Sequence, residues 1–148
     1  MSDVLQKTRR TALTWDQEFK PKVKQLEEYL ERLTGAAGVS NTDLFMLCLA
    51  VGFKLRKIRP IPARKSDAVR ISYLKESHLA LMKSVALTHT GNYMVLLSED
   101  EVFDIVEQYA AGGLELLSVE MENANSDFSI YLLRLLLESS KNVIGLKD

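Results

Sequence analysis

Hydrophobic residues recur at helical spacing in the first quarter of the chain. They lie four, three, four and three positions apart, with charged residues between them: Phe19, Val23, Leu26, Leu30 and Leu33. This spacing aligns them along one face of an α-helix. Proline is tolerated in the first turn of a helix and glycine commonly follows the last, so the pattern predicts a helix that begins near Lys20 or Pro21 and ends before Gly35.

The next segment is apolar on every side. Residues 44–55 form the predicted helix, and residues 40–43 before it begin with Ser40, whose side chain suits an N-terminal cap. A helix without a polar face is expected in the protein interior. We therefore expect this segment to be the central, buried helix of the fold.

Further helices are predicted in the second half. One covers about residues 73–90, with Gly91 as its stop. Residues 93–97 suit a short extended piece. Ser98 and Glu101 then have the spacing of a capping box, which predicts the start of the next helix.

Two adjacent glycines, Gly112 and Gly113, interrupt that fourth helical pattern. Each costs about 1 kcal/mol relative to alanine inside a helix, so the pair indicates either a break or a close crossing with another helix. A last helix is predicted for about residues 126–140. The expected fold class is all-α, a compact bundle of about five helices around the buried central helix.

The chain shows no repeat and no linker that would divide it, and 148 residues suit one domain. We expect a single helical domain, residues 1–148, with an N-terminal polar arm at 1–18. Residues 57–72 are predicted to form an irregular, basic surface loop, because Pro60 and Pro62 cannot donate backbone hydrogen bonds and favour extended neighbours.

The composition is that of an ordinary globular protein, with 47% hydrophobic and 26% charged residues. The longest apolar run, residues 44–53, is far shorter than the roughly 20 residues that span a bilayer, so no membrane role is expected. The single cysteine, Cys48, excludes an intramolecular disulfide, and residues 1–10 contain no apolar stretch of a signal peptide. These features predict a cytoplasmic location.

Charge is distributed unevenly although the net charge is only −1. Residues 1–83 hold 16 Lys and Arg against 9 Asp and Glu, a net +7, whereas residues 84–148 hold 3 against 11, a net −8. A chain with this asymmetry can present a basic face.

The strongest candidate site is a run of eight cations that contains only one acidic residue, Asp67: Lys54, Arg56, Lys57, Arg59, Arg64, Lys65, Arg70 and Lys75. Guanidinium groups pair with phosphate oxygens through two hydrogen bonds, so the run is predicted to bind the nucleic-acid backbone. A charged run is also commonly a solvated loop, and the sequence leaves both interpretations open. No base-reading motif accompanies it.

The sequence shows no catalytic centre, cofactor motif or metal site. Cys48 lies in an apolar run that favours the neutral thiol, and His78 and His89 lie eleven positions apart, too far along one helix to share a metal. Glycine-rich phosphate loops are absent. We expect a protein that is not an enzyme and has no cofactor. If it were an enzyme, its catalytic groups, for instance Tyr73 or His78, would have to be assembled across subunits.

Several features, in this order, resemble the DndE family of small helical proteins from bacterial DNA phosphorothioation systems. They are Leu33-Thr34-Gly35 at a helix end, the apolar helix 44–53, the proline-containing loop, Arg70-Ile71-Ser72-Tyr73-Leu74, and Tyr109-Ala110-Ala111-Gly112-Gly113-Leu114. The similarity covers about residues 26–119. The chain departs from the pattern in lacking a glycine after Leu74 and in extending further at its C-terminus.

The resemblance implies a homo-oligomer, a tetramer in that family, that binds DNA with some preference for nicked duplex. It also implies partner subunits of a DNA-modification or phage-defence complex that carry the chemistry. From the residues alone, a second hypothesis is a structural subunit whose basic half meets the acidic half of another chain without binding DNA.

Overall fold

The computed structural model describes residues 5–35, 38–60 and 65–124, and these are mainly helical. The described elements, in chain order, are β1 (Ala12–Asp16), a 3-10 turn (Gln17–Phe19), α1 (Lys20–Thr34), α2 (Asn41–Lys54), β2 (Lys65–Arg70), a second 3-10 turn (Ile71–Tyr73), α3 (Glu76–Thr90), a 3-10 helix (Tyr93–Leu97) and α4 (Glu99–Ala124). The described part of the chain therefore contains four α-helices and a small sheet. The prediction was about five helices without a sheet. The helix predicted for residues 126–140 lies outside the described residues.

The first helix begins and ends where the sequence predicts, whereas the second, predicted for residues 44–55, begins three residues earlier, at Asn41, and ends at Lys54. α1 starts one residue before Pro21 and ends at Thr34, and the φ of 70° at the next residue, Gly35, is the left-handed conformation that glycine adopts without strain. Ser40 caps α2, because its side-chain oxygen accepts a hydrogen bond of 3.0 Å from the Asp43 amide. In the core, Phe45 of α2 packs against Trp15, with ring centroids 5.2 Å apart.

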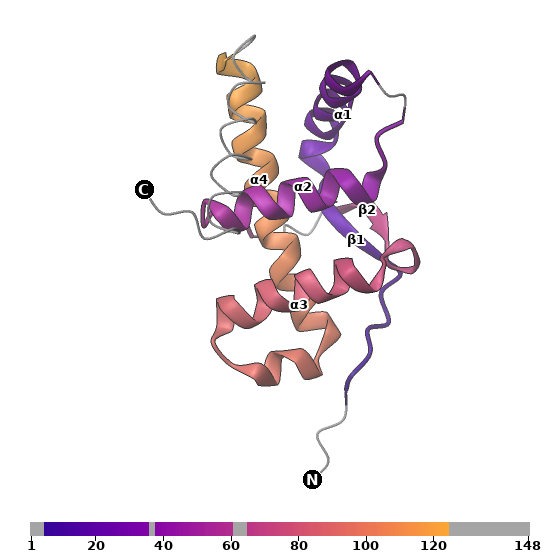
Figure 1. Ribbon diagram of the computed structural model, residues 1–148, viewed down its shortest axis with the longest axis vertical. Coiled ribbons are helices and arrows are strands. Elements are labelled where there is room, and N and C mark those ends of the chain that lie inside the picture. Colours follow the sequence, from indigo (N-terminus) through magenta and orange to yellow (C-terminus); the bar gives the residue numbers. More distant parts are fainter. Residues whose placement is uncertain (1–4, 36–37, 61–64, 125–148) are drawn as a thin grey trace.

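α4 is one unbroken helix that α2 and α3 cross (Figure 1). It begins after Ser98, as predicted, and the Ser98 hydroxyl accepts a 3.3 Å hydrogen bond from the Glu101 amide. The glycine pair lies inside it, so the close-crossing alternative holds. A Cβ atom added to Gly113 would overlap the Cys48 carbonyl of α2 and lie 2.8 Å from the Gly52 nitrogen.

A two-stranded antiparallel sheet is the feature that the all-α prediction missed. β1 lies in the predicted polar arm and β2 in the predicted irregular loop, and their register places Asp16 opposite Lys65 and Ala12 opposite Arg70. The inward residues of β1 are buried, with Leu13 at 0% and Trp15 at 4% exposure. Each strand is short and the register shifts between Leu13 and Thr14, so the pattern of either segment alone is too weak to predict a strand.

Two boundaries around α3 also differ from prediction. The helix begins at Glu76 and not near Tyr73, because residues 71–73 form a 3-10 turn and the next two residues are extended. Residues 93–97, expected to be extended, form a 3-10 helix that Asn92 caps by accepting a hydrogen bond from the Met94 amide.

The described part of the predicted N-terminal arm is attached to the fold. Gln6 donates a backbone hydrogen bond of 2.7 Å to the Leu97 carbonyl and accepts one of 3.0 Å from the Glu99 amide. The chain before β1 therefore runs along the start of α4. Among the described helices, none combines the length and the apolar character required to cross a bilayer.

Candidate nucleic-acid interface

The chain leaves α2 through an unusual backbone turn at Arg56. This residue has a φ of 53°, and among the described residues it is the one non-glycine with a positive φ. The Arg56 amide donates to the Phe53 carbonyl at 3.2 Å, and the Lys57 amide donates to the Gly52 carbonyl at 2.8 Å. This is the pattern in which a helix end normally carries glycine, yet the position here holds an exposed arginine.

The residues that follow are fixed against α4. A Cβ atom on Gly112 would overlap the Lys57 carbonyl, so glycine is required for the chain to pass this close. Two residues later, the Arg59 amide donates a 3.0 Å hydrogen bond to the Gln108 carbonyl of α4. The first glycine of the pair thus accommodates this connection, and the second accommodates the crossing of α2.

Lys54, Arg56 and Lys57 are therefore held by a rigid backbone; we call these three residues the α2 exit. Arg56 is exposed, and Lys54 and Lys57 are half-buried. Neither Arg56 nor Lys57 forms an ion pair with an acidic residue in the described part of the chain.

Arg59, by contrast, is engaged inside the protein. Its guanidinium lies 3.5 Å from the buried carboxylate of Asp16 and 3.2 Å from that of Glu115. It also lies over the Phe19 ring, 4.5 Å from the centroid. These contacts join β1, α4 and the turn before α1, and they occupy the groups that a phosphate would need.

The other predicted cations lie elsewhere. Lys65 and Arg70 stand at the two ends of β2, and Lys75 immediately precedes α3. All three are exposed, and we call them the strand group. In Figure 1, α2 ends on the left, whereas β2 and the start of α3 lie on the right. The predicted run is thus two separate cationic groups, and Arg64 lies outside the described residues.

Part of the charge asymmetry is neutralised by ion pairs within the chain. Arg10 contacts three acidic residues of α4, at 3.3 Å from Asp100, 2.6 Å from Asp104 and 3.0 Å from Glu107. Lys22 similarly lies 3.4 Å from Glu122. Together with the Arg59–Glu115 pair, these contacts join the basic half of the sequence to its acidic half.

Glu107 is the centre of the largest of these networks and is only 2% exposed. One of its oxygens accepts from Arg10, and the other accepts from the Thr14 amide at 2.6 Å and the Thr14 hydroxyl at 2.8 Å. Burial acts to lower the pKa of Arg10, but its hydrogen bond to Asp104 and the charges of Glu107, Asp104 and Asp100 raise it overall. The sequence alone does not reveal this network, because its partners lie 90 or more positions apart.

The groups considered for catalysis have structural contacts. Burial raises the pKa of the Cys48 thiol far above its ordinary value, which favours the unreactive neutral form. The His78 ring accepts a hydrogen bond from the Lys75 amide, and the His89 ring lies 2.8 Å from the Tyr109 hydroxyl. Within the described ranges, no three His, Cys, Asp or Glu residues are grouped to hold a metal ion.

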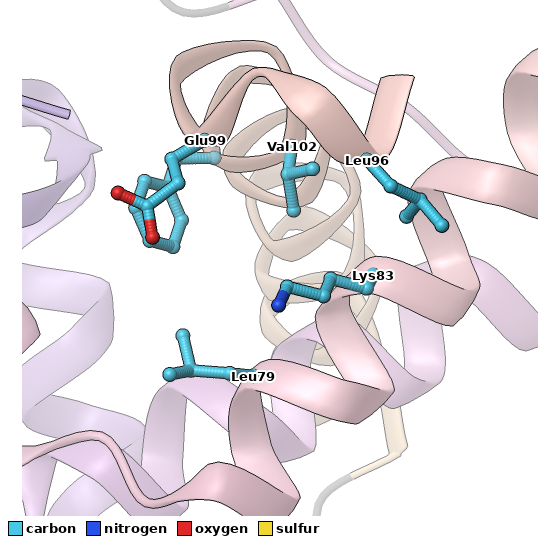
Figure 2. A pocket seen from close by; sticks show the side chains of 6 residues that line it. Leu79, Lys83, Leu96, Glu99 and Val102 are labelled. Atoms are coloured by element: carbon cyan, nitrogen blue, oxygen red, sulfur yellow. The ribbon is translucent and has the colours of Figure 1, made fainter. Parts of the chain in front are cut away.

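A small hollow lies between α3 and the start of α4 (Figure 2). Leu79, Lys83, Leu96, Glu99, Val102 and Phe103 line it. Its free space corresponds to about one water molecule. The Glu99 carboxylate also already accepts a 2.8 Å hydrogen bond from the Thr8 amide. The hollow is therefore too small to hold a substrate, and its one carboxylate is engaged within the protein.

Comparison with known proteins identifies a family for the chain. No curated protein and no solved structure matches the chain. The model of a family described as DNA sulphur modification system-associated protein 4 matches residues 19–145. The link to DNA sulphur modification that the DndE resemblance implied is confirmed, although the matched family is not specifically DndE. Since the match covers most of the chain, the protein belongs to the family of DNA sulphur modification system-associated protein 4.

Proposed function

We propose that this protein is a non-catalytic, DNA-binding accessory subunit of a DNA sulphur modification system, and that it contacts phosphates first through the α2 exit. Its membership of a family associated with such systems makes DNA, or a complex bound to DNA, the natural partner. The modification enzymes would carry the chemistry.

The observation that carries the proposal is the conformation of Arg56. An L-residue in the left-handed region costs roughly 1–2 kcal/mol, which glycine would avoid. Strained residues of this kind cluster at functional sites, where the side chain has a role that outweighs the cost of the strained backbone. A guanidinium is well suited to that role because its planar donors match two phosphate oxygens at once.

The surrounding geometry supports the same assignment. Lys54 and Lys57 lie within three residues of Arg56, and their backbone is fixed by the end of α2 and by the contact of Lys57 with Gly112. A preorganised group of cations loses less conformational entropy when it binds than a flexible loop does. Phosphate contacts of this kind read the backbone and not the base sequence.

The alternative of a purely structural subunit, assembled through oppositely charged halves, has less support. Arg10, Lys22 and Arg59 already pair with acidic residues of their own chain. Fewer charges then remain for a head-to-tail contact between copies. From the DndE resemblance we further propose a homo-oligomer, a preference for nicked duplex and a role in phage defence.

The test is a titration with short intact, nicked and single-stranded DNA over a series of salt concentrations. We expect Arg56→Ala with Lys57→Ala to weaken binding and to reduce the slope of log affinity against log salt by about 2, since roughly one counterion is released per phosphate contact.

Matched controls come from exposed cations elsewhere. Lys20→Ala with Lys24→Ala removes two charges from α1, and Arg70→Ala with Lys75→Ala removes two from the strand group. An equal loss in all three double variants would show that net charge alone matters, which contradicts an α2-exit site. No binding to any DNA at low salt would contradict DNA binding itself and would favour a protein partner.

A further inference from the structure

The outer face of α3 carries apolar side chains that nothing in the described structure covers. Of the ten exposed large hydrophobic residues in the described ranges, five lie within α3 or no more than four positions beyond it: Tyr73, Leu81, Leu87, Tyr93 and Met94. The opposite face of the helix, with Met82, Val85 and Ala86, is buried against the core. α3 therefore carries large apolar side chains on both sides, as a helix between a core and an interface would.

Two hydroxyls near the centre of this outer face are already satisfied. The Ser84 hydroxyl donates to the Ala80 carbonyl at 2.9 Å, and the Thr88 hydroxyl donates to the Ser84 carbonyl at 2.9 Å. Burial of these hydroxyls would leave no donor unpaired, so the usual cost of burying polar groups is small here. Lys83 lies on the flank facing α4, where it lines the hollow of Figure 2.

The exposed residues are arranged symmetrically about Ser84. Leu81 and Leu87 lie three positions before and after it, and the exposed Ala80 and Thr88 lie four positions before and after it. At 100° per residue, Ser84 is the centre of the face and the two leucines are its edges. The two most exposed large side chains described, Tyr73 at 65% and Tyr93 at 72%, flank opposite ends of α3.

This symmetry fits one occupant, a second copy of the same chain. A two-fold interface requires that when residue i meets residue j, residue j also meets residue i. Two α3 helices packed antiparallel about Ser84 meet this condition, since Leu81 of each copy lies level with Leu87 of the other. The end that carries Tyr73 then lies over the end that carries Tyr93 of the second copy.

We propose that the outer face of α3 is a two-fold interface through which this protein forms a homodimer. This interface would give the homo-oligomer proposed above a defined surface, and it does not depend on DNA binding. A helix of 15 residues is about 22 Å long. A contact limited to it and its flanking tyrosines is smaller than the roughly 800 Å² per partner of a standard interface. We therefore expect a reversible dimer that dissociates on dilution.

The first test is the oligomeric state of the full chain, measured by sedimentation velocity from low to high micromolar protein. We expect wild type to shift from monomer to dimer, and Leu81→Glu with Leu87→Glu to remain monomeric while its circular dichroism and Tm stay close to wild type. Leu33→Glu, which adds a charge at an exposed leucine of α1, is the control and should dimerise normally.

The second test is cross-linking at the proposed axis. For helices packed about 9–10 Å apart, with Cα atoms about 2.3 Å from each helix axis, facing Cα atoms lie about 4.4–5.4 Å apart, within disulfide range. Ser84→Cys should therefore form a covalent dimer on mild oxidation. Ser77→Cys should not, because its two copies would lie about 20 Å apart.

Either of two results would overturn the proposal. One is a wild-type protein that stays monomeric at every concentration, which would leave this face for a different subunit of the sulphur modification system. The other is a dimer that survives both leucine substitutions and shows no cross-link at Ser84→Cys, which would assign the interface to another surface.

Discussion

Gly52 of α2 and Gly113 of α4 lie backbone against backbone where the two helices cross. A Cβ atom added to Gly113 would lie 2.8 Å from the Gly52 nitrogen, and one added to Gly52 would lie 2.9 Å from the Gly113 nitrogen. Backbone atoms cannot move aside as a flexible side chain can. The crossing, which also sets the position of the α2 exit, therefore depends on the absence of side chains at both positions.

Gly113→Ala is expected to destabilise the protein by about 3 kcal/mol, although alanine favours a helix interior by about 1 kcal/mol over glycine. The overlap with the Cys48 carbonyl outweighs that preference. Urea denaturation measures the change. As a control, Gly91→Ala meets no neighbouring atom and suffers only from its φ of 67°, so it should cost about 1–2 kcal/mol. Equal effects would contradict a tight crossing.

The helices were predictable because their signals are local. Pro21, Gly35, Ser40 and the Ser98 box each act within one helical turn, and the structure confirms the boundaries that they predict. The glycine pair was recognisable as a break or a crossing, but choosing between these required the partner helix. The sheet joins segments about 50 residues apart, and neither strand alternates strongly enough to be detected by itself.

Glu107→Gln is expected to destabilise the protein by about 2–3 kcal/mol, because the new amide group would turn a donor towards donors of Arg10 or Thr14 and leave a buried group unpaired. Asp104→Asn is the matched control, since Asp104 contacts the same guanidinium but its side chain is 59% exposed. We expect it to cost less than about 1 kcal/mol. Thermal unfolding of both variants would test this, and similar losses would count against a special role for the buried carboxylate.

The candidate site was only partly predictable, since sequence reveals cations but not their partners. Arg56 and Arg59 are three residues apart and look equivalent in the run. In the structure Arg56 is exposed on a strained backbone, whereas Arg59 lies between two carboxylates and an aromatic ring. The separation of the α2 exit from the strand group was likewise invisible, because β2 returns the chain to the other side of the molecule.

Arg59→Ala is expected to lower stability by about 2–3 kcal/mol, because it leaves the buried Asp16 carboxylate without its cation. Arg59→Lys should recover only part of this loss, since a single ammonium cannot replace a guanidinium that bridges two carboxylates and stacks on a ring. The salt slope of DNA binding, measured where the variant is folded, should stay at the wild-type value. A lower slope would show that Arg59 also contacts a phosphate.

Arg56→Gly separates the strain at the α2 exit from its charge. Glycine adopts a φ of 53° without a steric penalty but makes the unfolded chain more flexible, so we expect a net gain in stability of about 0.5–1 kcal/mol. Arg56→Ala removes the same charge and keeps a Cβ atom, so it should bring no such gain. Both variants should lose DNA affinity to the same extent, measured by the titration proposed above. Greater stability with unchanged DNA affinity would mean that the strained arginine serves something other than DNA, and unchanged stability would remove the strain argument itself.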